Sequence, residues 1–271
     1  MLRSIAGLLA SLALVLGLPA ASLAADSASP VLARIVKSGQ LRVGMSGNQI
    51  PLNMTSKSGE IIGLEPDLAH LLAGAMGVEA KLVIKPFGEL LPALKAGKID
   101  LVMSGMTITP ERNLQVAFVG PYFVSGKSIL TKSKALMAVD EAGDINDASL
   151  TLAALEGSTS QLFVEKMVPK AKLMKTRDYD AGVKAVIDGK ADAFVADFPI
   201  CVFSVLRYPE AKLATLAQPI TIEPIGIALP ANDALLANLV QNYLRALEIT
   251  GMLAKLQIKW FKDGSWLSEL P

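Results

Sequence analysis

The chain has 271 residues, of which 52% are hydrophobic and 5% aromatic, and 26 basic against 25 acidic residues leave a formal net charge of +1. This length supports one large α/β unit or two domains with a real hydrophobic core, and the composition excludes a disordered chain. The near-zero charge argues against a nucleic-acid partner, while a single cysteine (Cys201) and a single histidine (His70) argue against disulfides, metal clusters and Ser-His-Asp chemistry.

Residues 1–24 have the pattern of a cleavable secretory signal peptide. A single basic residue, Arg3, precedes fifteen uncharged and mostly apolar residues, and Ser22-Leu23-Ala24 supplies the small residues of a cleavage site. The alternative is an uncleaved membrane anchor, for which the apolar run is short of the roughly 20 residues that a span needs. We therefore expect an exported, soluble protein that begins near Ala25.

The rest of the chain alternates predicted strands and helices. The spacing of apolar residues predicts strands over residues 41–45, 80–85, 99–103, 150–155, 171–175, 192–196 and 225–229, and helices over 31–37, 66–76, 90–96, 161–167, 179–187, 202–206 and 233–260. Such alternation is typical of an α/β fold with mainly parallel sheets. The polar, acidic stretch 132–148 separates two βα blocks and indicates two lobes.

A short loop after the predicted strand 99–103 is the first candidate site. Ser104, Gly105 and Thr107 follow this strand, and ligands of open α/β sheets lie beyond the carboxyl ends of the strands. Hydroxyls and free backbone N–H groups there would suit an anion. The alternative is an ordinary βα turn, which the loop by itself favours.

Arg112 is the second candidate. With Thr109 as N-cap and Pro110 as the first helical residue, Arg112 falls at N3, where a cation opposes the helix dipole. A bidentate pair with a carboxylate would explain an arginine at this position. The alternatives are a pair with Glu111 and a solvated surface arginine.

Asp197 is the third candidate, because it ends the predicted strand 192–196 and could receive a ligand cation. The alternative is a capping role for the helix that follows Pro199. An arginine and an aspartate on opposite lobes would suit a zwitterion. Weaker candidates are the hydroxyls of Ser158 and Thr159 at another strand end and the ring of Phe87, which could stack on a ligand or belong to the core.

These segments resemble the periplasmic solute-binding proteins of polar amino-acid ABC transporters, family 3. The similarity covers nearly the whole mature chain, and it is strongest over residues 90–112, which read LLPALKAGKIDLVMSGMTITPER. Further matching segments are Gly39-x-Leu41-Arg42-Val43-Gly44, Gly63-x-x-x-Asp67-Leu68, Phe118 with Pro121-Tyr122, residues 188–193 and Lys259-Trp260-Phe261.

The resemblance implies a type II periplasmic-binding-protein fold, in which each lobe is a mainly parallel sheet flanked by helices and two strands form the hinge. Lobe 1 would comprise residues 25–130 and 220–271, and lobe 2 residues 131–219. The family's ligand-binding positions fall on residues of both lobes. Arg112, Ser104, Gly105, Thr107, Ser158 and Thr159 would hold the ligand carboxylate, Asp197 the ammonium, and Phe87 the side chain.

The stretch after Gly44 departs from the family pattern. The family's usual acid is Ser46 here, its stacking aromatic is Gln49, and its phenylalanine is Leu52. A basic ligand side chain would lose a counter-charge and a ring for cation–π contact. We therefore expect a small, neutral polar or acidic amino acid, and a related carboxylate is the alternative.

The resemblance implies a binding protein of the periplasm rather than an enzyme. We expect no cofactor or metal, no nucleic-acid partner because of the near-zero charge, and a monomer because no interface signature stands out. Its ligand would pass to an ABC transporter membrane permease. Two alternatives remain open. One is a cyclohexadienyl or arogenate dehydratase on the same scaffold, for which Glu156 and Asp197 are the candidate acids. The other is a ligand-binding sensor module that acts through a partner.

Overall fold

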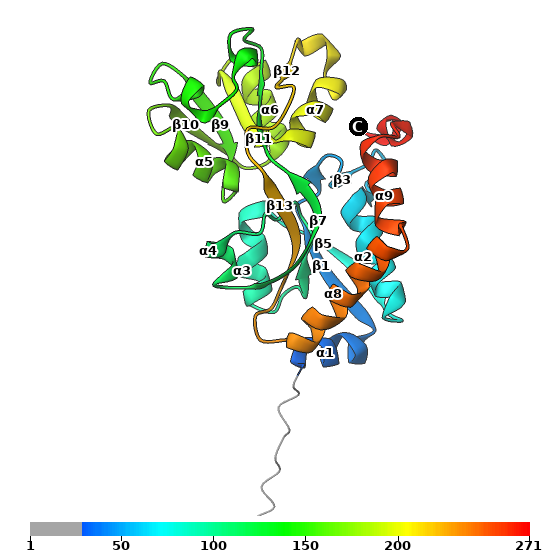
Figure 1. Ribbon diagram of the computed structural model, residues 1–271. Helices are drawn as coiled ribbons and strands as arrows, with labels where there is room; N and C mark the ends of the chain where they lie inside the picture. Colours follow the sequence, from blue (N-terminus) through cyan, green and yellow to red (C-terminus); the bar gives the residue numbers. More distant parts are fainter. Residues whose placement is uncertain (1–28) are drawn as a thin grey trace, which may run out of the picture.

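The computed structural model describes residues 29–271, which form two lobes joined by a pair of crossing segments (Figure 1). The predicted signal peptide, residues 1–24, lies outside the described residues. Within residues 29–271, no helix is both long and apolar enough to cross a membrane. Each lobe is built on one five-stranded sheet with helices packed on it, which confirms the predicted two-lobed α/β architecture.

The first lobe, the lower one in Figure 1, holds a sheet of order β5-β1-β6-β13-β7. In it, β1 (Gln40–Met45) runs parallel to β5 (Glu79–Ile84) and β6 (Leu101–Val102), whereas β13 (Glu223–Leu229) is antiparallel to β6 and β7 (Ala117–Ser125). The remaining elements are β2 (Asn48–Gln49), β3 (Asn53–Thr55), β4 (Ile61–Ile62), α1 (Pro30–Ser38), α2 (Leu64–Ala75), η1 (Phe87–Glu89), α3 (Leu90–Lys95), α4 (Pro110–Asn113), α8 (Ala234–Ile249), α9 (Met252–Phe261) and η5 (Ser265–Glu269).

The second lobe, the upper one in Figure 1, holds a sheet of order β10-β9-β11-β8-β12. Here β9 (Thr151–Leu155) runs parallel to β10 (Lys172–Thr176) and β11 (Ala193–Asp197), whereas β8 (Lys127–Thr131) is antiparallel to β11 and β12 (Ala214–Thr215). The remaining elements are α5 (Thr159–Met167), α6 (Tyr179–Ile187), α7 (Phe198–Arg207) and the short turns η2 (Leu136–Ala138), η3 (Ala142–Ile145) and η4 (Pro209–Ala211).

Both sheets are mixed, which refines the prediction of mainly parallel sheets. The parallel part of each comes from the predicted βα units, and the antiparallel part comes from strands next to the two crossings between the lobes. The first crossing lies at Gly126, four residues before the predicted boundary at residue 130, because β8 already pairs in the second sheet. A Cβ at Gly126 would lie 1.9 Å from the Thr221 carbonyl oxygen, so only glycine allows the two crossing segments to approach this closely.

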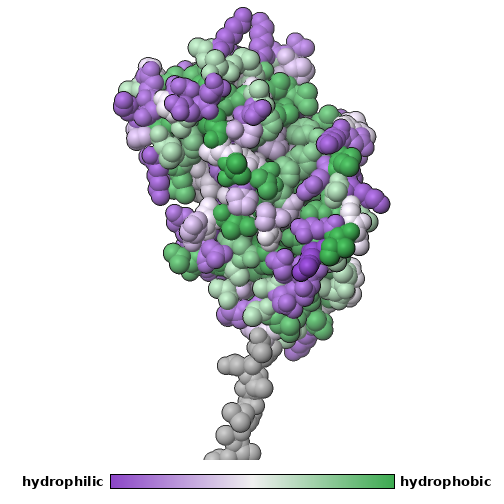
Figure 2. Space-filling view, viewed as in Figure 1, coloured by the Kyte–Doolittle hydropathy of each residue, from purple (hydrophilic) through white to green (hydrophobic). Residues whose placement is uncertain are grey.

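Hydrophobic packing continues from one lobe into the other. One buried cluster includes Phe87, Leu90 and Val102 of the first lobe together with Tyr179 and Phe194 of the second. Figure 2 shows hydrophobic residues also at the surface near the waist between the lobes. Val124, near the end of β7, and Ile222, just before β13, are exposed. Cys201 is fully buried, and burial raises the pKa of its thiol to about 12, as expected for an inert structural cysteine.

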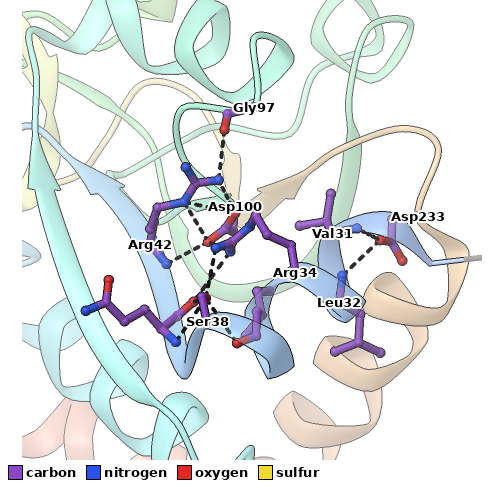
Figure 3. A network of polar contacts seen from close by, with 10 residues as sticks. Val31, Leu32, Arg34, Ser38, Arg42, Gly97, Asp100 and Asp233 are labelled. Atoms are coloured by element: carbon purple, nitrogen blue, oxygen red, sulfur yellow. Dashed lines mark hydrogen bonds and ion pairs between the residues drawn. The ribbon is translucent and has the colours of Figure 1, made fainter. Parts of the chain in front are cut away.

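A buried carboxylate stabilises the end of the first sheet that lies away from the Ser104 loop. Asp100 accepts hydrogen bonds from the Arg42 backbone N–H at 2.7 Å and from its guanidinium at 2.7 Å, and it pairs with Arg34 as well (Figure 3). Two guanidiniums and a backbone donor satisfy this carboxylate, which explains an acid within an apolar strand segment.

Asp233 connects the start of two helices and gives a prediction about stability. Its carboxylate accepts the N–H groups of Val31 (2.8 Å) and Leu32 (3.2 Å) in α1 (Figure 3). It also accepts the N–H of Leu236 (3.0 Å) in α8 and the Ser29 hydroxyl. Burial acts to raise the pKa of Asp233, but these donors outweigh it and hold the pKa below its usual value. We expect Asp233→Asn to lower the free energy of unfolding by about 1–2 kcal/mol at pH 7.

The pH dependence of this loss follows from the direction of the shift. A lowered folded-state pKa gives stability that is present above the unfolded-state pKa and is lost as the pH falls through the folded-state pKa. Urea titrations between pH 7 and pH 3 should therefore show the difference between wild type and Asp233→Asn shrinking in acid. Asp140→Asn, at an exposed aspartate, is the control, and a difference independent of pH would contradict the prediction.

Candidate functional site

Arg112 lies between the two lobes. The Thr109 hydroxyl accepts the Arg112 backbone N–H at 3.3 Å, so Thr109 caps α4 as predicted. The guanidinium donates from Nη1 to the Thr107 carbonyl at 2.9 Å and from Nη2 to the Gly157 carbonyl of the second lobe at 3.3 Å. It also lies over the ring of Phe87, 5.7 Å from the centroid, and it makes no ion pair with Glu111 among the described residues.

The Ser104 loop meets the altered segment after β1. Ser104 Oγ donates to Gln49 Oε1 at 2.6 Å and lies 3.2 Å from Ser46 Oγ, so the structure brings these three predicted residues together. Gln49 is fully buried, and its Nε2 donates to the Tyr179 hydroxyl of the second lobe at 3.0 Å. Tyr179 was not predicted, and the contact depends on two residues 130 positions apart.

The Gly105 N–H, predicted to face a ligand carboxylate, already has an internal acceptor. It donates to Glu65 Oε1 at 2.6 Å, and the same carboxylate accepts from the Tyr122 hydroxyl and the Asn53 amide. Burial raises the pKa of Glu65, and these donors act against the rise. Gly105 therefore anchors the loop to α2 in this structure, through an acid that sequence reasoning missed.

Thr107 of the first lobe and Thr159 of the second contact the same carboxylate, that of Glu223, which sequence reasoning did not identify. Their hydroxyl oxygens lie 3.3 Å apart, and both donate to Glu223 Oε2, at 2.8 and 2.9 Å. Glu223 is the first residue of β13, and it lies where this strand enters the first sheet. One carboxylate from the hinge thus contacts both lobes.

Asp197 ends β11 as predicted but is already paired. Lys127 Nζ donates to Asp197 Oδ1 at 2.6 Å and to Glu223 Oε2 at 2.9 Å, and the Lys127 side chain is 1% exposed. Asp197 occupies the N-cap position of α7, as the capping alternative requires, but its side chain accepts no hydrogen bond from that helix. Lys127 and Glu223 were missed, although a charged residue at the start of an otherwise apolar strand was the available signal.

Charges in the cleft act on one another. Burial lowers the pKa of Arg112, and the carboxylates of Glu223 and Asp197 act in the opposite direction. Burial also acts to raise the pKa of Glu223, but Lys127 and the two threonine hydroxyls outweigh it and the pKa is lowered. In residues 29–271 no three His, Cys, Asp or Glu side chains are grouped to hold a metal ion.

Ser158 and Phe87, which were predicted to contact the ligand, have structural roles here: Ser158 caps α5 and Phe87 is buried. Ser158 Oγ accepts the Gln161 N–H at 3.2 Å and donates to the Leu155 carbonyl at 2.6 Å, so this hydroxyl caps α5. The N–H of Thr159, at the first position of α5, has no acceptor within the helix and lies at the positive end of its dipole. Phe87 is buried in the core under Arg112.

A cavity of about 290 Å³ opens between the lobes beside this site. The first lobe lines it with Ser46, Asn48 and Thr55, and the second lobe with Asp180 and Arg207. Asn48 Oδ1 and Arg207 Nε are buried without a hydrogen-bond partner among the described residues. The polar lining continues from the Ser46–Gln49 end of the site.

The chain is similar to a known family of bacterial proteins and to several of its members. The model of the bacterial extracellular solute-binding proteins, family 3, matches residues 41–263. The ABC transporter arginine-binding protein 1 of Escherichia coli K12 is 30% identical over 232 residues, which cover 82% of this chain and 90% of that protein. The cyclohexadienyl dehydratase of Pseudomonas aeruginosa is 28% identical over 262 residues, which cover 96% of each chain.

A solved structure is similar over most of the chain. It is an ancestral amino acid-binding protein, a precursor of cyclohexadienyl dehydratase, with a TM-score of 0.79 and 35% sequence identity. The match covers 85% of this chain and 99% of that one.

Proposed function

This chain belongs to the bacterial extracellular solute-binding proteins, family 3, and on that basis we propose that it captures an amino acid in the interlobe cleft for an ABC transporter permease. In this proposal the protein acts in the periplasm as a monomer, after removal of residues 1–24. It binds and releases its ligand without catalysis. The similarity to an arginine-binding protein of an ABC transporter supports the transport role.

Arg112 is the observation that carries the proposal. Its guanidinium donates to the Gly157 carbonyl, just before the N-cap of α5, and the charges of Glu223 and Asp197 act against the effect of burial on its pKa. A ligand carboxylate would meet a guanidinium and the N–H of Thr159 together, and charge-assisted hydrogen bonds of this kind are strong. The ligand would then contact both lobes only in the closed form, so it would favour closure by its differential affinity.

The other end of the cleft supports a small, neutral polar or acidic amino acid. Ser46 and Gln49 bring hydroxyl and amide groups rather than a carboxylate or an aromatic ring. A cationic side chain would find no counter-charge on these two residues. The cavity of about 290 Å³ next to Ser46 provides room for a short polar side chain.

A thermal-shift screen tests the proposal. The mature chain would be unfolded and refolded to remove carried-over ligand, then heated with each of the twenty amino acids and with several carboxylates. A ligand at about 100 times its Kd adds about 2.7 kcal/mol of stability. We expect a shift confined to one class of amino acid, and no shift with any compound would overturn the proposal.

A dehydratase is the second candidate function, favoured by the relative that matches 96% of the chain. Such a reaction needs a general acid at the substrate. Glu156 is exposed and Asp197 is bonded to Lys127, so neither predicted acid is a free proton donor in the cleft. A turnover assay with prephenate and arogenate decides between the two functions, and product formation would favour the enzyme.

Gly157 lies where the two lobes approach each other closely, and this contact gives a prediction about closure of the lobes. This residue has φ of +75°, and a Cβ there would lie 3.0 Å from Gly88 Cα in the other lobe. We expect Gly157→Ala to hold the lobes apart and to weaken ligand binding about tenfold, measured by calorimetry.

Gly88→Ala is the matched control, because its Cβ would have ordinary contact, 3.7 Å from the Glu156 carbonyl. It should bind within about twofold of wild type. Equal affinity of Gly157→Ala and wild type would contradict the prediction.

A further inference from the structure

Lys127, Asp197 and Glu223 form a buried cluster with an excess of negative charge. One ammonium pairs with two carboxylates, at 2.6 and 2.9 Å, and the side chains are 1%, 6% and 13% exposed respectively. With the lysine and both acids ionised, the cluster carries a net charge of −1. A buried net charge is costly unless another group compensates it.

Each carboxylate keeps an oxygen that lacks a strong donor. Lys127 Nζ donates to Asp197 Oδ1, and no residue of the described chain donates to Asp197 Oδ2. Lys127, Thr107 and Thr159 all donate to Glu223 Oε2, which leaves Oε1 with only the Thr221 hydroxyl at 3.5 Å. Two acceptor oxygens from two elements, β11 and β13, therefore remain beside one lysine.

The compensating charge within the cleft is Arg112, which contacts neither acid directly. Its N–H groups reach the carbonyls of Thr107 and Gly157, while Glu223 and Asp197 are the carboxylates that act on it most strongly. Arg112 and the cluster together are neutral. A ligand that brings only a carboxylate would make the closed site negative, whereas a zwitterion would leave it neutral.

We propose that Glu223 is a ligand-binding residue that, together with Asp197, receives the ligand's ammonium and selects α-amino acids over carboxylates without an amino group. Lys127 is the positioning residue that holds the two acids side by side. This inference rests on the proposed function, because it needs the ligand carboxylate at Arg112. It adds a hinge residue to a site otherwise built from lobe residues.

Matched pairs of ligands test this inference. Serine with glycerate, aspartate with malate, and glutamate with 2-hydroxyglutarate differ by an ammonium against a hydroxyl. Calorimetry should show wild type binding the amino acid of the recognised pair about 100-fold more tightly than its hydroxy acid. In Glu223→Gln the amide NH₂ would face the ammonium, because its oxygen is needed by Lys127 and the threonines.

We expect Glu223→Gln to weaken binding of the amino acid about tenfold and to leave the hydroxy acid within about threefold of wild type. Glu248→Gln, at an exposed residue of α8, is the control, and Asp197→Asn is a second variant that removes the other acid. Equal losses for both members of a pair would show a structural role for Glu223 and overturn the inference.

Calorimetry of the wild type with the paired amino acids and hydroxy acids tests the inference without any variant. Wild type that prefers a hydroxy acid would overturn the inference, because Lys127 would then itself stand in for the ligand ammonium, while the cleft would remain a carboxylate site. If no amino acid and no carboxylate binds at all, the proposed function fails as well.

Discussion

Arg112→Ala is expected to weaken ligand binding about 100-fold, which corresponds to about 2.7 kcal/mol. The guanidinium donates to the Gly157 carbonyl just before α5, whereas the ammonium of Lys127 is already bonded to Asp197 and Glu223. Loss of the guanidinium would leave a ligand carboxylate without a charge-assisted partner in a partly desolvated site. Titration calorimetry with the amino acid found in the thermal screen measures the effect.

Two further variants separate charge from geometry at this position. Arg112→Lys keeps the charge but loses the planar, bidentate donor set, so its affinity should fall between those of Arg112→Ala and wild type. Arg177→Ala removes an exposed arginine that pairs only with Asp178, and it should bind as wild type does. Unchanged binding by Arg112→Ala would show that the ligand carboxylate does not bind at Arg112, and it would contradict the prediction.

Lys127→Met is expected to cause the largest loss of stability, about 3–5 kcal/mol at pH 7. Methionine fills a similar volume but leaves Asp197 and Glu223 buried next to each other without their cation. In wild type, Asp197 and Glu223 together raise the pKa of Lys127 against the effect of burial. Guanidinium-induced unfolding of the refolded, ligand-free protein measures the loss.

The loss should depend on pH in a defined direction. Without Lys127, the two carboxylates would have folded-state pKa values above their unfolded values, which costs stability above the unfolded pKa and costs none below it. The deficit of Lys127→Met should therefore shrink between pH 7 and about pH 4. A loss below about 1 kcal/mol, or a loss independent of pH, would contradict this account.

Controls for Lys127→Met are available within the chain. Lys132→Met removes an exposed lysine whose ammonium contacts only the Ile187 carbonyl, and it should leave stability nearly unchanged. The double variant Lys127→Met with Glu223→Gln removes one of the two uncompensated charges. It should be more stable than Lys127→Met, which a double-mutant cycle would quantify.

Local sequence patterns predicted the parts of the site that depend on neighbouring residues. Thr109 caps α4 and sets Arg112 in its first turn, because both residues belong to one short segment. The βα alternation placed Ser104 and Asp197 at carboxyl ends of strands. The departure at Ser46 and Gln49 was also visible, and the structure brings both residues to Ser104.

The partners of these residues were not predictable in the same way. Gln49 meets Tyr179, and Thr107 meets Thr159 and Glu223, across separations of 52 to 130 residues. Strand β7 and the crossing at Gly126 were also missed, because alternation of apolar residues does not record which sheet a strand joins. Only the pairing of β8 with β11 places Lys127 opposite Asp197.

The sequence by itself determined the two-lobed α/β family, the capped helix that carries Arg112, and the uncharged residues Ser46 and Gln49 that contact Ser104. Periodicity, helix caps and motif spacing act over a few residues, so a linear pattern contains them. The tertiary structure alone decided that Asp197 shares Lys127 with Glu223 and that one hinge carboxylate contacts both lobes. Such charge pairing forms only when distant strands are brought together, because burial and distance set its strength.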